Sequence, residues 1–329
     1  MPVTPGWTEL VAKYQAPDTR RSIQQVCNSF LPFIALLVLM YFSITVSYWL
    51  TMAMAIPAAG FLARIFIIQH DCGHGSFFRS AGANDRLGFI CGVLTMTPYK
   101  HWRLSHAIHH RGASNLAKRG IGSIRTMTVN EYRALSPGRR LRYRIYRHPL
   151  VLFGVGPFFN FVVAHRFAFT AHTRKEWPSL HWTNLALGGL ATLVILTIGI
   201  KALVLVYAPI MLIASSVGTW LFYVQHQYEN TYWVGDEDWD YSLAALRGSS
   251  YYKLPAVLRW FTGNIGFHHV HHLSPRIPNY RLKQCHDQNP IFQQAMVLTL
   301  GSSIRSASLH LWDEATQRLV GYPRVPKAA

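Results

Sequence analysis

Four long runs of apolar residues constrain the fold of this chain more than any other feature. They cover residues 30–48, 50–69, 183–200 and 202–224. A helix needs about 20 predominantly apolar residues to cross a bilayer, so each run is long enough for one crossing. Tight turns join the first run to the second and the third to the fourth. The pattern therefore predicts an all-α integral membrane protein with four transmembrane helices in two hairpins.

The charge distribution predicts the orientation of these hairpins. The formal net charge is +18, although charged residues make up only 14% of the chain. Lys201 is the single basic residue expected on the far side of the membrane, because the other basic residues, apart from Arg64 inside the second run, lie before, between and after the hairpins. The positive-inside rule then places both termini in the cytoplasm. We expect residues 70–182 and 225–329 to form a cytosolic cap with interfacial helices, within one membrane-bound domain of residues 1–329.

Composition also bears on several function classes. A strongly basic soluble protein favours nucleic acid as a partner, but here the charge follows the sidedness of the membrane, so we expect no nucleic acid. The first apolar run is too long for a signal peptide and lacks a cleavage site of small residues, so it is interpreted as an anchor. Arg64 interrupts the second run and is interpreted as an arginine that extends to the membrane surface.

Three histidine clusters are the second dominant feature, and each has helical spacing. Their members are His70, His74, His106, His109, His110, His268, His271 and His272. On a helix, residues three or four positions apart share one face, so each cluster directs two or three imidazoles toward one point. Imidazole is the commonest metal ligand and suits iron, zinc and copper. Eight imidazoles exceed one ordinary site and predict two metal ions.

A ninth histidine and several polar side chains complete the candidate site. His226 ends the fourth apolar run, at the height where His70 leaves the second, and is predicted to be a ligand. Metal-bound histidines usually donate their second nitrogen to a carboxylate or a carbonyl group. Asp71, Asp240 and Asn264 are predicted as hydrogen-bond partners behind the ligands. His269 and the other unclustered histidines are treated as ordinary residues.

The donor set narrows the choice of metal. Zinc hydrolases usually have three protein ligands, an open position and often a His-Glu-x-x-His motif, which this chain lacks. An all-imidazole set for two ions at a membrane surface better suits redox iron that handles dioxygen.

The order of the three histidine motifs after paired hydrophobic hairpins resembles the membrane-bound fatty acid desaturases. Residues 70–78 resemble the first histidine box of the acyl-lipid delta-12 (omega-6) group. Residues 224–226 and 239–240 resemble the segment before the third box, and residues 271–280 resemble its continuation. The resemblance covers approximately residues 30–285.

This resemblance implies an enzyme that introduces a cis double bond into the acyl chain of a membrane lipid, at the delta-12 position of oleoyl chains. It also implies a non-haem centre of two iron ions, dioxygen as co-substrate, and the eight clustered histidines with His226 as ligands. The sequence has no His-Pro-Gly-Gly segment typical of a fused cytochrome b5 domain. We therefore expect a separate electron donor, such as ferredoxin or a cytochrome b5-type protein.

Two other functions compete with desaturation. Related families use the same histidine scaffold to hydroxylate or ketolate lipids and carotenoids. A metal-binding or transport protein is the alternative of a different class. Transporters place their polar ligands near the bilayer midplane, whereas these histidines lie at or beyond the ends of the crossings.

Overall fold

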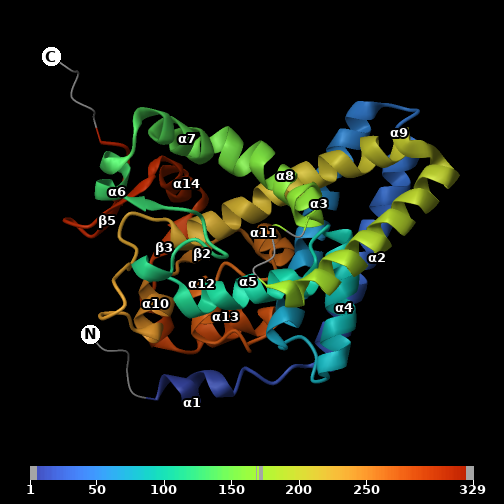
Figure 1. The fold of residues 1–329 in the computed structure, drawn as a ribbon. Helices are drawn as coiled ribbons and strands as arrows, with labels where there is room; N and C mark the ends of the chain where they lie inside the picture. The colour runs from blue at the N-terminus through green and yellow to red at the C-terminus, as the bar shows by residue number, and fades with distance from the viewer. Residues whose placement is uncertain (1–5, 168, 170–172, 324–329) are drawn as a thin grey trace.

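The computed structural model describes residues 6–167, 169 and 173–323, and the fold is mostly helical (Figure 1). The α-helices are α1 (Trp7–Ala12), α2 (Thr19–Ser43), α3 (Tyr48–His74), α4 (Ala81–Leu94), α5 (Tyr99–Gly112), α6 (Val129–Ala134), α7 (Pro137–Arg147), α8 (Gly156–Val162), α9 (Trp177–His226), α10 (Tyr241–Arg247), α11 (Ala256–Phe261), α12 (His268–Leu273), α13 (Asn279–Asp287) and α14 (Leu300–Ser303). Short 3₁₀ helices are η1 (Leu116–Lys118), η3 (Ala164–Arg166), η5 (Arg174–Glu176), η6 (Pro290–Gln294) and η7 (Ile304–Ser308), and η2 (Val151–Val155) is a π-helix. The strands are β1 (Met127–Thr128), β2 (Tyr251–Lys253), β3 (Val297–Thr299), β4 (Leu311–Asp313) and β5 (Arg318–Val320).

Helices α2 and α3 form the first hairpin. Asp18 caps α2 by accepting hydrogen bonds from the backbone N–H groups of Arg20 and Arg21. At the turn, the buried hydroxyls of Ser43 and Thr51 lie 2.7 Å apart and join the two helices. The turn lies between Ser43 and Tyr48, inside the first predicted run of residues 30–48. The sequence did not indicate this position, because apolar residues continue through the turn.

Helix α9 contains the second hairpin. Gly199 has φ 85° and ψ 155°, which is not helical and which residues with a Cβ atom rarely adopt. Figure 1 shows the two arms of α9 diverging from a sharp bend. The break therefore lies two positions before Lys201, where the sequence places the charged residue of the turn.

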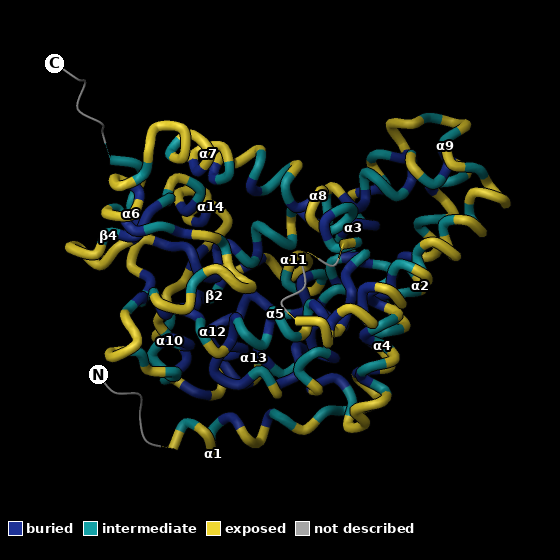
Figure 2. Tube along the Cα trace, in the orientation of Figure 1, coloured by how far each residue is buried: buried dark blue, intermediate teal, exposed yellow. Residues whose placement is uncertain are grey.

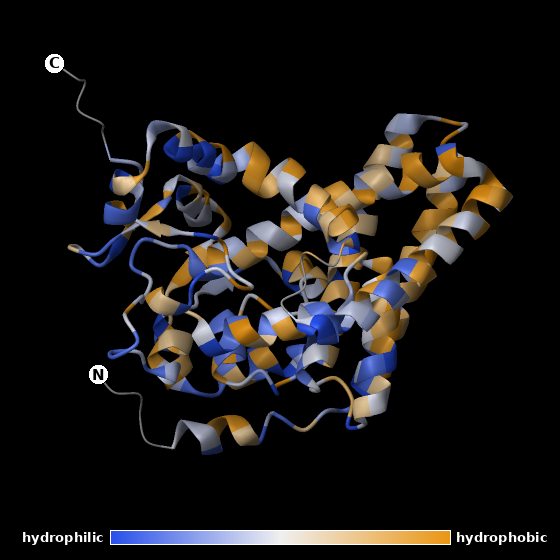
Figure 3. Cartoon of the chain, viewed as in Figure 1, coloured by the Kyte–Doolittle hydropathy of each residue, from blue (hydrophilic) through white to orange (hydrophobic). Residues whose placement is uncertain are grey.

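Several helices are long and apolar enough to cross a membrane. Within the described residues, three segments meet this condition: Thr19–Ser43, Tyr48–His74 and Arg174–His226. A bent pair, Pro137–Arg147 with Val151–Arg166, would be a fourth, with 58° between its two parts. Trp49 and Leu196 are 84% and 80% exposed. Figures 2 and 3 show exposed residues and hydrophobic residues along α2 and α9. The structure thus provides several membrane-spanning candidates, while the predicted number of four crossings stays a prediction.

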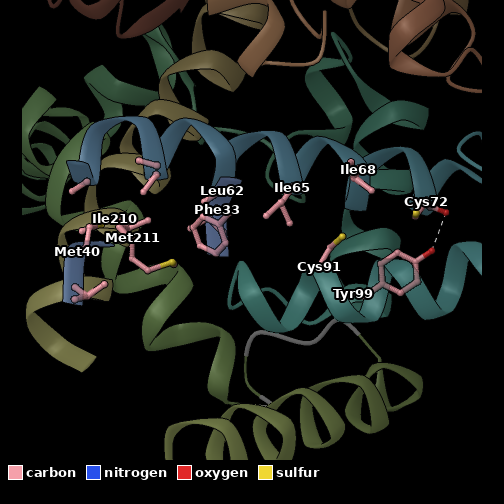
Figure 4. Packing of buried hydrophobic residues seen from close by; sticks show 14 of the residues in the cluster. Phe33, Met40, Leu62, Ile65, Ile68, Cys72, Cys91, Tyr99, Ile210 and Met211 are labelled. Atoms are coloured by element: carbon pink, nitrogen blue, oxygen red, sulfur yellow. Dashed lines mark hydrogen bonds between the residues drawn. The ribbon is translucent and has the colours of Figure 1, made fainter. Parts of the chain in front are cut away.

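The main core joins α2, α3, α4 and α9 around aliphatic and aromatic side chains (Figure 4). Tyr99, at the start of α5, donates a hydrogen bond to the carbonyl oxygen of Cys72 over 2.9 Å. A Cβ atom at Gly88 would lie 2.4 Å from the Tyr99 ring, and one at Gly60 would lie 2.9 Å from the Phe261 ring. Both glycines therefore permit close packing of helices against aromatic rings.

The position of the Arg64 side chain differs from the one predicted from the sequence. Its side chain is buried, stacks on the Trp260 ring at 3.9 Å from the centroid, and donates to the Trp260 carbonyl oxygen. The interpretation of Arg64 as an arginine that extends to the membrane surface is wrong, because α11 packs against α3 and covers it.

In the described part of the chain, two small sheets lie in the half of the molecule away from the two hairpin turns, and β5 lies at its edge (Figure 1). Strand β4 pairs in parallel with β1 and antiparallel with β5, and β2 pairs in parallel with β3. The all-α prediction omits these strands, because two or three residues are too few to show the alternating pattern of a strand.

Candidate metal centre

The nine candidate ligands come from the ends of two long helices and from two shorter ones. His70 and His74 occupy the last turns of α3, which Gly75 ends with φ 68° and a hydrogen bond to the Cys72 carbonyl oxygen. His226 is the last residue of α9. The second cluster lies on α5 and the third on α12. The three distant clusters therefore meet because α3, α5, α9 and α12 converge.

These histidines form two groups, and in each group the potential ligand atoms all lie within 4.8 Å of one another. The five-histidine group is His70, His74, His106, His110 and His271, and the four-histidine group is His109, His226, His268 and His272. Each of the second and third clusters contributes to both groups. Two histidines of one cluster that are four positions apart always belong to the same group. His109 belongs to the four-histidine group while His106 and His110 belong to the five-histidine group, and His271 belongs to the five-histidine group.

The imidazole nitrogens point toward one another at short distances. In the five-histidine group, His271 Nε2 lies 3.0 Å from both His70 Nε2 and His110 Nε2. In the four-histidine group, His226 Nε2 lies 3.1 Å from His109 Nε2 and 2.9 Å from His268 Nε2. A neutral imidazole has only one N–H, so it cannot donate to two neighbouring ring nitrogens at once. A cation bound between the rings would accept the lone pairs of all these nitrogens.

Hydrogen bonds behind the ring nitrogens hold two of these imidazoles in place. His70 Nδ1 donates to Asp71 Oδ1 over 3.0 Å, and the other Asp71 oxygen accepts from the backbone and side-chain N–H groups of Asn279. His226 Nδ1 donates to the Gly248 carbonyl oxygen over 3.1 Å. With Nδ1 protonated, Nε2 presents its lone pair inward, as a metal ligand requires.

Burial favours the neutral form of these histidines. It lowers the pKa of His109, His268 and His272 well below the usual value, and neighbouring imidazoles lower it further. In addition, His74 Nε2 and His272 Nε2 are buried and have no hydrogen-bond partner among the described residues. Neutral imidazoles with unsatisfied nitrogens fit transition-metal ions, because a metal ligand must offer an unprotonated nitrogen.

Asn264 and Asp240, the other two predicted hydrogen-bond partners, differ in how they are connected to the histidines. Asn264 donates to the Asn279 carbonyl oxygen over 3.2 Å, so it reaches His70 through Asn279 and Asp71. Asp240 caps α10 by accepting from the Leu243 N–H, and its carboxylate bonds none of the nine histidines in the described part of the chain.

Sequence reasoning missed three residues that support the site. Asn279 holds Asp71, Tyr241 donates to the His272 carbonyl oxygen over 2.6 Å, and Trp102 stacks on His106 with ring centroids 4.5 Å apart. Asn279 lies in the segment that resembles the continuation of the third box, which was the available signal. His269 pairs with His286 over 3.1 Å and belongs to neither group.

An apolar cavity adjoins the histidines. It has a volume of about 690 Å³ and is lined by residues of α3, α5, α8 and α9. His70 and His106 of the five-histidine group and His268 of the four-histidine group form part of its wall. The arrangement therefore combines two candidate metal sites with a space suited to an apolar molecule.

Comparisons with known proteins agree with this geometry. The fatty acid desaturase family model matches residues 13–296. The chain is 48% identical to a fatty acid desaturase of Bacillus subtilis (strain 168), over 96% of this chain and 90% of that protein. It is 27% identical to an sn-1 acyl-lipid omega-3 desaturase (ferredoxin) of Nostoc sp. (strain 36), over 66% of this chain and 61% of the relative.

A further relative is an sn-1 oleoyl-lipid 12-desaturase of Synechocystis sp. (strain ATCC 27184 / PCC 6803 / Kazusa), which is 25% identical over 68% of this chain and 64% of its own length. The family model covers most of the chain, and the Bacillus relative matches it almost from end to end. These matches, with histidine groups able to hold metal, confirm the resemblance noted in the sequence. The chain belongs to the fatty acid desaturase family and is an oxidoreductase.

Proposed function

We propose that this protein is a multi-pass membrane enzyme that uses two iron ions and dioxygen to introduce a cis double bond into an acyl chain of a membrane lipid. Residues 1–329 act as one membrane-bound domain. The ligands are the nine histidines of the two groups, and Asp71 and Asn264 hold them from behind. Asp240 is the remaining predicted partner, and it acts through α10 and Tyr241 instead of bonding a histidine.

One observation carries this proposal: two all-imidazole groups adjoin an apolar cavity, and each group contributes at least one side chain to the cavity wall. Two iron ions would lie in these groups and, when bound, supply the redox chemistry that reduces dioxygen to water with two electrons from a donor. Overall, two adjacent methylenes lose one hydrogen each, and two further protons and two electrons complete the formation of two water molecules. The cavity holds the chain and excludes water from the reacting carbons.

The chain's own residues determine orientation. Asp71 holds His70 through Nδ1, and the Gly248 carbonyl holds His226 in the same way. Removing such partners typically costs 10–100-fold, by order of magnitude, in metal affinity or activity. The mechanism therefore depends on an outer layer of hydrogen bonds that reaches Asn279 of α13.

The finer details of the substrate are part of this proposal. A delta-12 double bond in oleoyl chains is supported by the likeness of the first histidine box and by a relative named as an sn-1 oleoyl-lipid 12-desaturase. A separate electron donor is supported by a relative whose name includes ferredoxin. A cytoplasmic cap and cytoplasmic termini are supported by the basic residues around the histidine clusters.

Expression in a host that lacks polyunsaturated lipids tests the function. We expect a second double bond at carbon 12 of oleoyl phospholipids, located by mass spectrometry in each lipid class, and two iron ions for each purified chain. A bond introduced first into a saturated chain would contradict the delta-12 assignment while preserving desaturation.

The same experiment separates the competing functions. A hydroxylase or ketolase would add oxygen to its product instead of removing two hydrogens. A metal transporter would change cellular metal content without altering lipids. Either result would overturn the proposed reaction.

A further inference from the structure

A second polar cluster lies in the wall of the apolar cavity, outside both histidine groups. It consists of His101 on α5, His165 on η3 and Glu176 at the end of η5. His101 and His165 line the cavity together with the candidate ligands His70 and His106. The cavity therefore connects this cluster, which we call the wall cluster, to the proposed metal centre.

The wall cluster is held rigidly from one side. Glu176 is buried, accepts a hydrogen bond from the Thr173 N–H over 2.6 Å, and forms a capping box with Thr173. Its other carboxylate oxygen pairs with His101 Nδ1, and His101 is also buried. A buried pair of this kind is fixed in position, since separating it would leave an uncompensated charge.

His165 completes the wall cluster and has an unsatisfied nitrogen. Its ring meets His101 edge-on, with centroids 5.7 Å apart. The Asn160 amide donates to His165 Nε2 over 3.3 Å, so a neutral His165 carries its proton on Nδ1. That Nδ1 atom is buried and has no partner among the described residues. A buried N–H without an acceptor is costly, and cavity ligands commonly provide the missing partner.

The required acceptor is an oxygen atom at one point of an otherwise apolar ligand. An acyl chain joined to a carrier has such an atom, namely the carbonyl oxygen of its ester or thioester. His101 and His106 are five positions apart on α5, which places their backbones about 7–8 Å apart along the helix axis and fixes the wall cluster relative to the metal centre on the same helix. A carbonyl bound at the wall cluster would therefore lie at a set distance from the metal centre.

We propose that the wall cluster binds the carbonyl group of the acyl substrate through the Nδ1–H of His165, and that this contact determines which methylenes reach the metal centre. This inference rests on the proposed desaturase function. His101 and Glu176 position the His165 ring. They are substrate-positioning residues and take no part in metal binding.

Substrates with and without the carbonyl oxygen test the proposal. Ester-linked and ether-linked phospholipids with the same chains would be compared on the wild type and on His165→Phe, which keeps a ring but loses the donor. We expect the ether link and the substitution each to raise KM about tenfold, as loss of one buried hydrogen bond predicts. Combined, they should cost little more than either alone, and both should broaden the distribution of double-bond positions.

Two further variants test whether the change in KM depends on the hydrogen-bond donor at position 165. His165→Gln keeps an N–H donor and should recover part of the wild-type KM. His310→Phe is the matched control, because His310 also has a buried Nδ1 with no partner in the described part of the chain, but stacks on Tyr322 outside the cavity. It should leave KM and the double-bond position unchanged. A parallel measurement of KM with an acyl thioester substrate distinguishes a lipid ester from a soluble carrier as the source of the carbonyl group.

Binding provides a readout that needs no turnover. Native mass spectrometry of the solubilised protein should show weaker binding of the ether lipid to the wild type, and equal binding of both lipids to His165→Phe. Equal binding of ester and ether lipids by the wild type would overturn the inference. Absence of any double bond with the wild type would instead overturn the proposed function, and the inference would fall with it.

Discussion

The Nε2 atoms of His226 and His268 lie 2.9 Å apart, although the two residues are 42 positions apart in the chain. One ends a long apolar helix, and the other begins the helix of the last histidine cluster. Their contact brings the only candidate ligand outside the three clusters into the four-histidine group. His226 thus provides the most direct test of the ligand assignment.

Replacing His226 with Ala should remove one of four imidazoles from the four-histidine group. We expect the purified variant to bind about half the wild-type iron and to lose desaturation by at least about 100-fold, since a lost ligand costs no less than its outer partner. Iron analysis and lipid profiling measure the two effects. His148→Ala is the control, because His148 is exposed and belongs to neither group. Full iron occupancy in His226→Ala would count against His226 as a ligand.

Asp71→Asn should weaken the site without removing a ligand. The amide cannot match the carboxylate as an acceptor for both His70 and Asn279, so we expect about 10–100-fold lower metal affinity or activity. The comparison variant is Asp240→Ala, which removes the cap of α10. It should lower stability by about 1 kcal/mol and lower iron affinity by less than Asp71→Asn does, because Asp240 reaches the histidines only through α10. Iron titration and thermal unfolding distinguish these outcomes.

Membrane sidedness can be tested at Lys201, two residues after the break at Gly199. In a background with Cys27→Ser, a membrane-impermeant maleimide should label Lys201→Cys in intact cells. Ala315→Cys, in the exposed turn after β4, should be labelled only after the membrane is opened. The reverse pattern would place the histidine-rich cap on the outer side.

Close packing at Gly88 predicts a stability effect. A methyl group there would lie 2.4 Å from the Tyr99 ring, so Gly88→Ala should destabilise the protein by about 1–3 kcal/mol through overpacking. Gly189→Ala is the matched control, since no atom of the residues that the structure describes lies within 4 Å of a Cβ added at Gly189. Thermal unfolding in detergent measures both variants. Equal stability of the two would contradict the packing role of Gly88.

Acid sensitivity should have a contribution from Glu131. Hydrogen bonds from Arg119, over 2.7 and 3.0 Å, hold the pKa of Glu131 below its usual value of 4.5. Because the folded-state pKa is lowered, the stabilisation is present above about pH 4.5 and is lost as the pH falls below it. Glu131→Gln keeps the capping box but removes the charge. Its stability deficit, below about 1 kcal/mol for this half-exposed pair, should vanish in acid.

Local patterns in the sequence were sufficient for the general architecture and the candidate ligands. Apolar run length predicted the long helices, because the width of the bilayer limits what can cross it. Spacings of three and four residues predicted shared faces for the clustered histidines, because helix geometry fixes those neighbours. The resemblance to desaturases rested on these same motifs, and the family match confirmed it.

The tertiary structure decided which histidine belongs to which group. His109 and His110 are adjacent in sequence but lie in different groups, since neighbouring positions on a helix point about 100° apart and face different partner helices. The partner of Asp71, the covering of Arg64 by Trp260 and the wall cluster also depend on contacts across many residues. Such contacts arise from helix packing, which local spacing does not specify. The sequence by itself thus determined which side chains were available to bind metal. Only the packing of α3, α5, α9 and α12 determined how these side chains are divided between the two histidine groups.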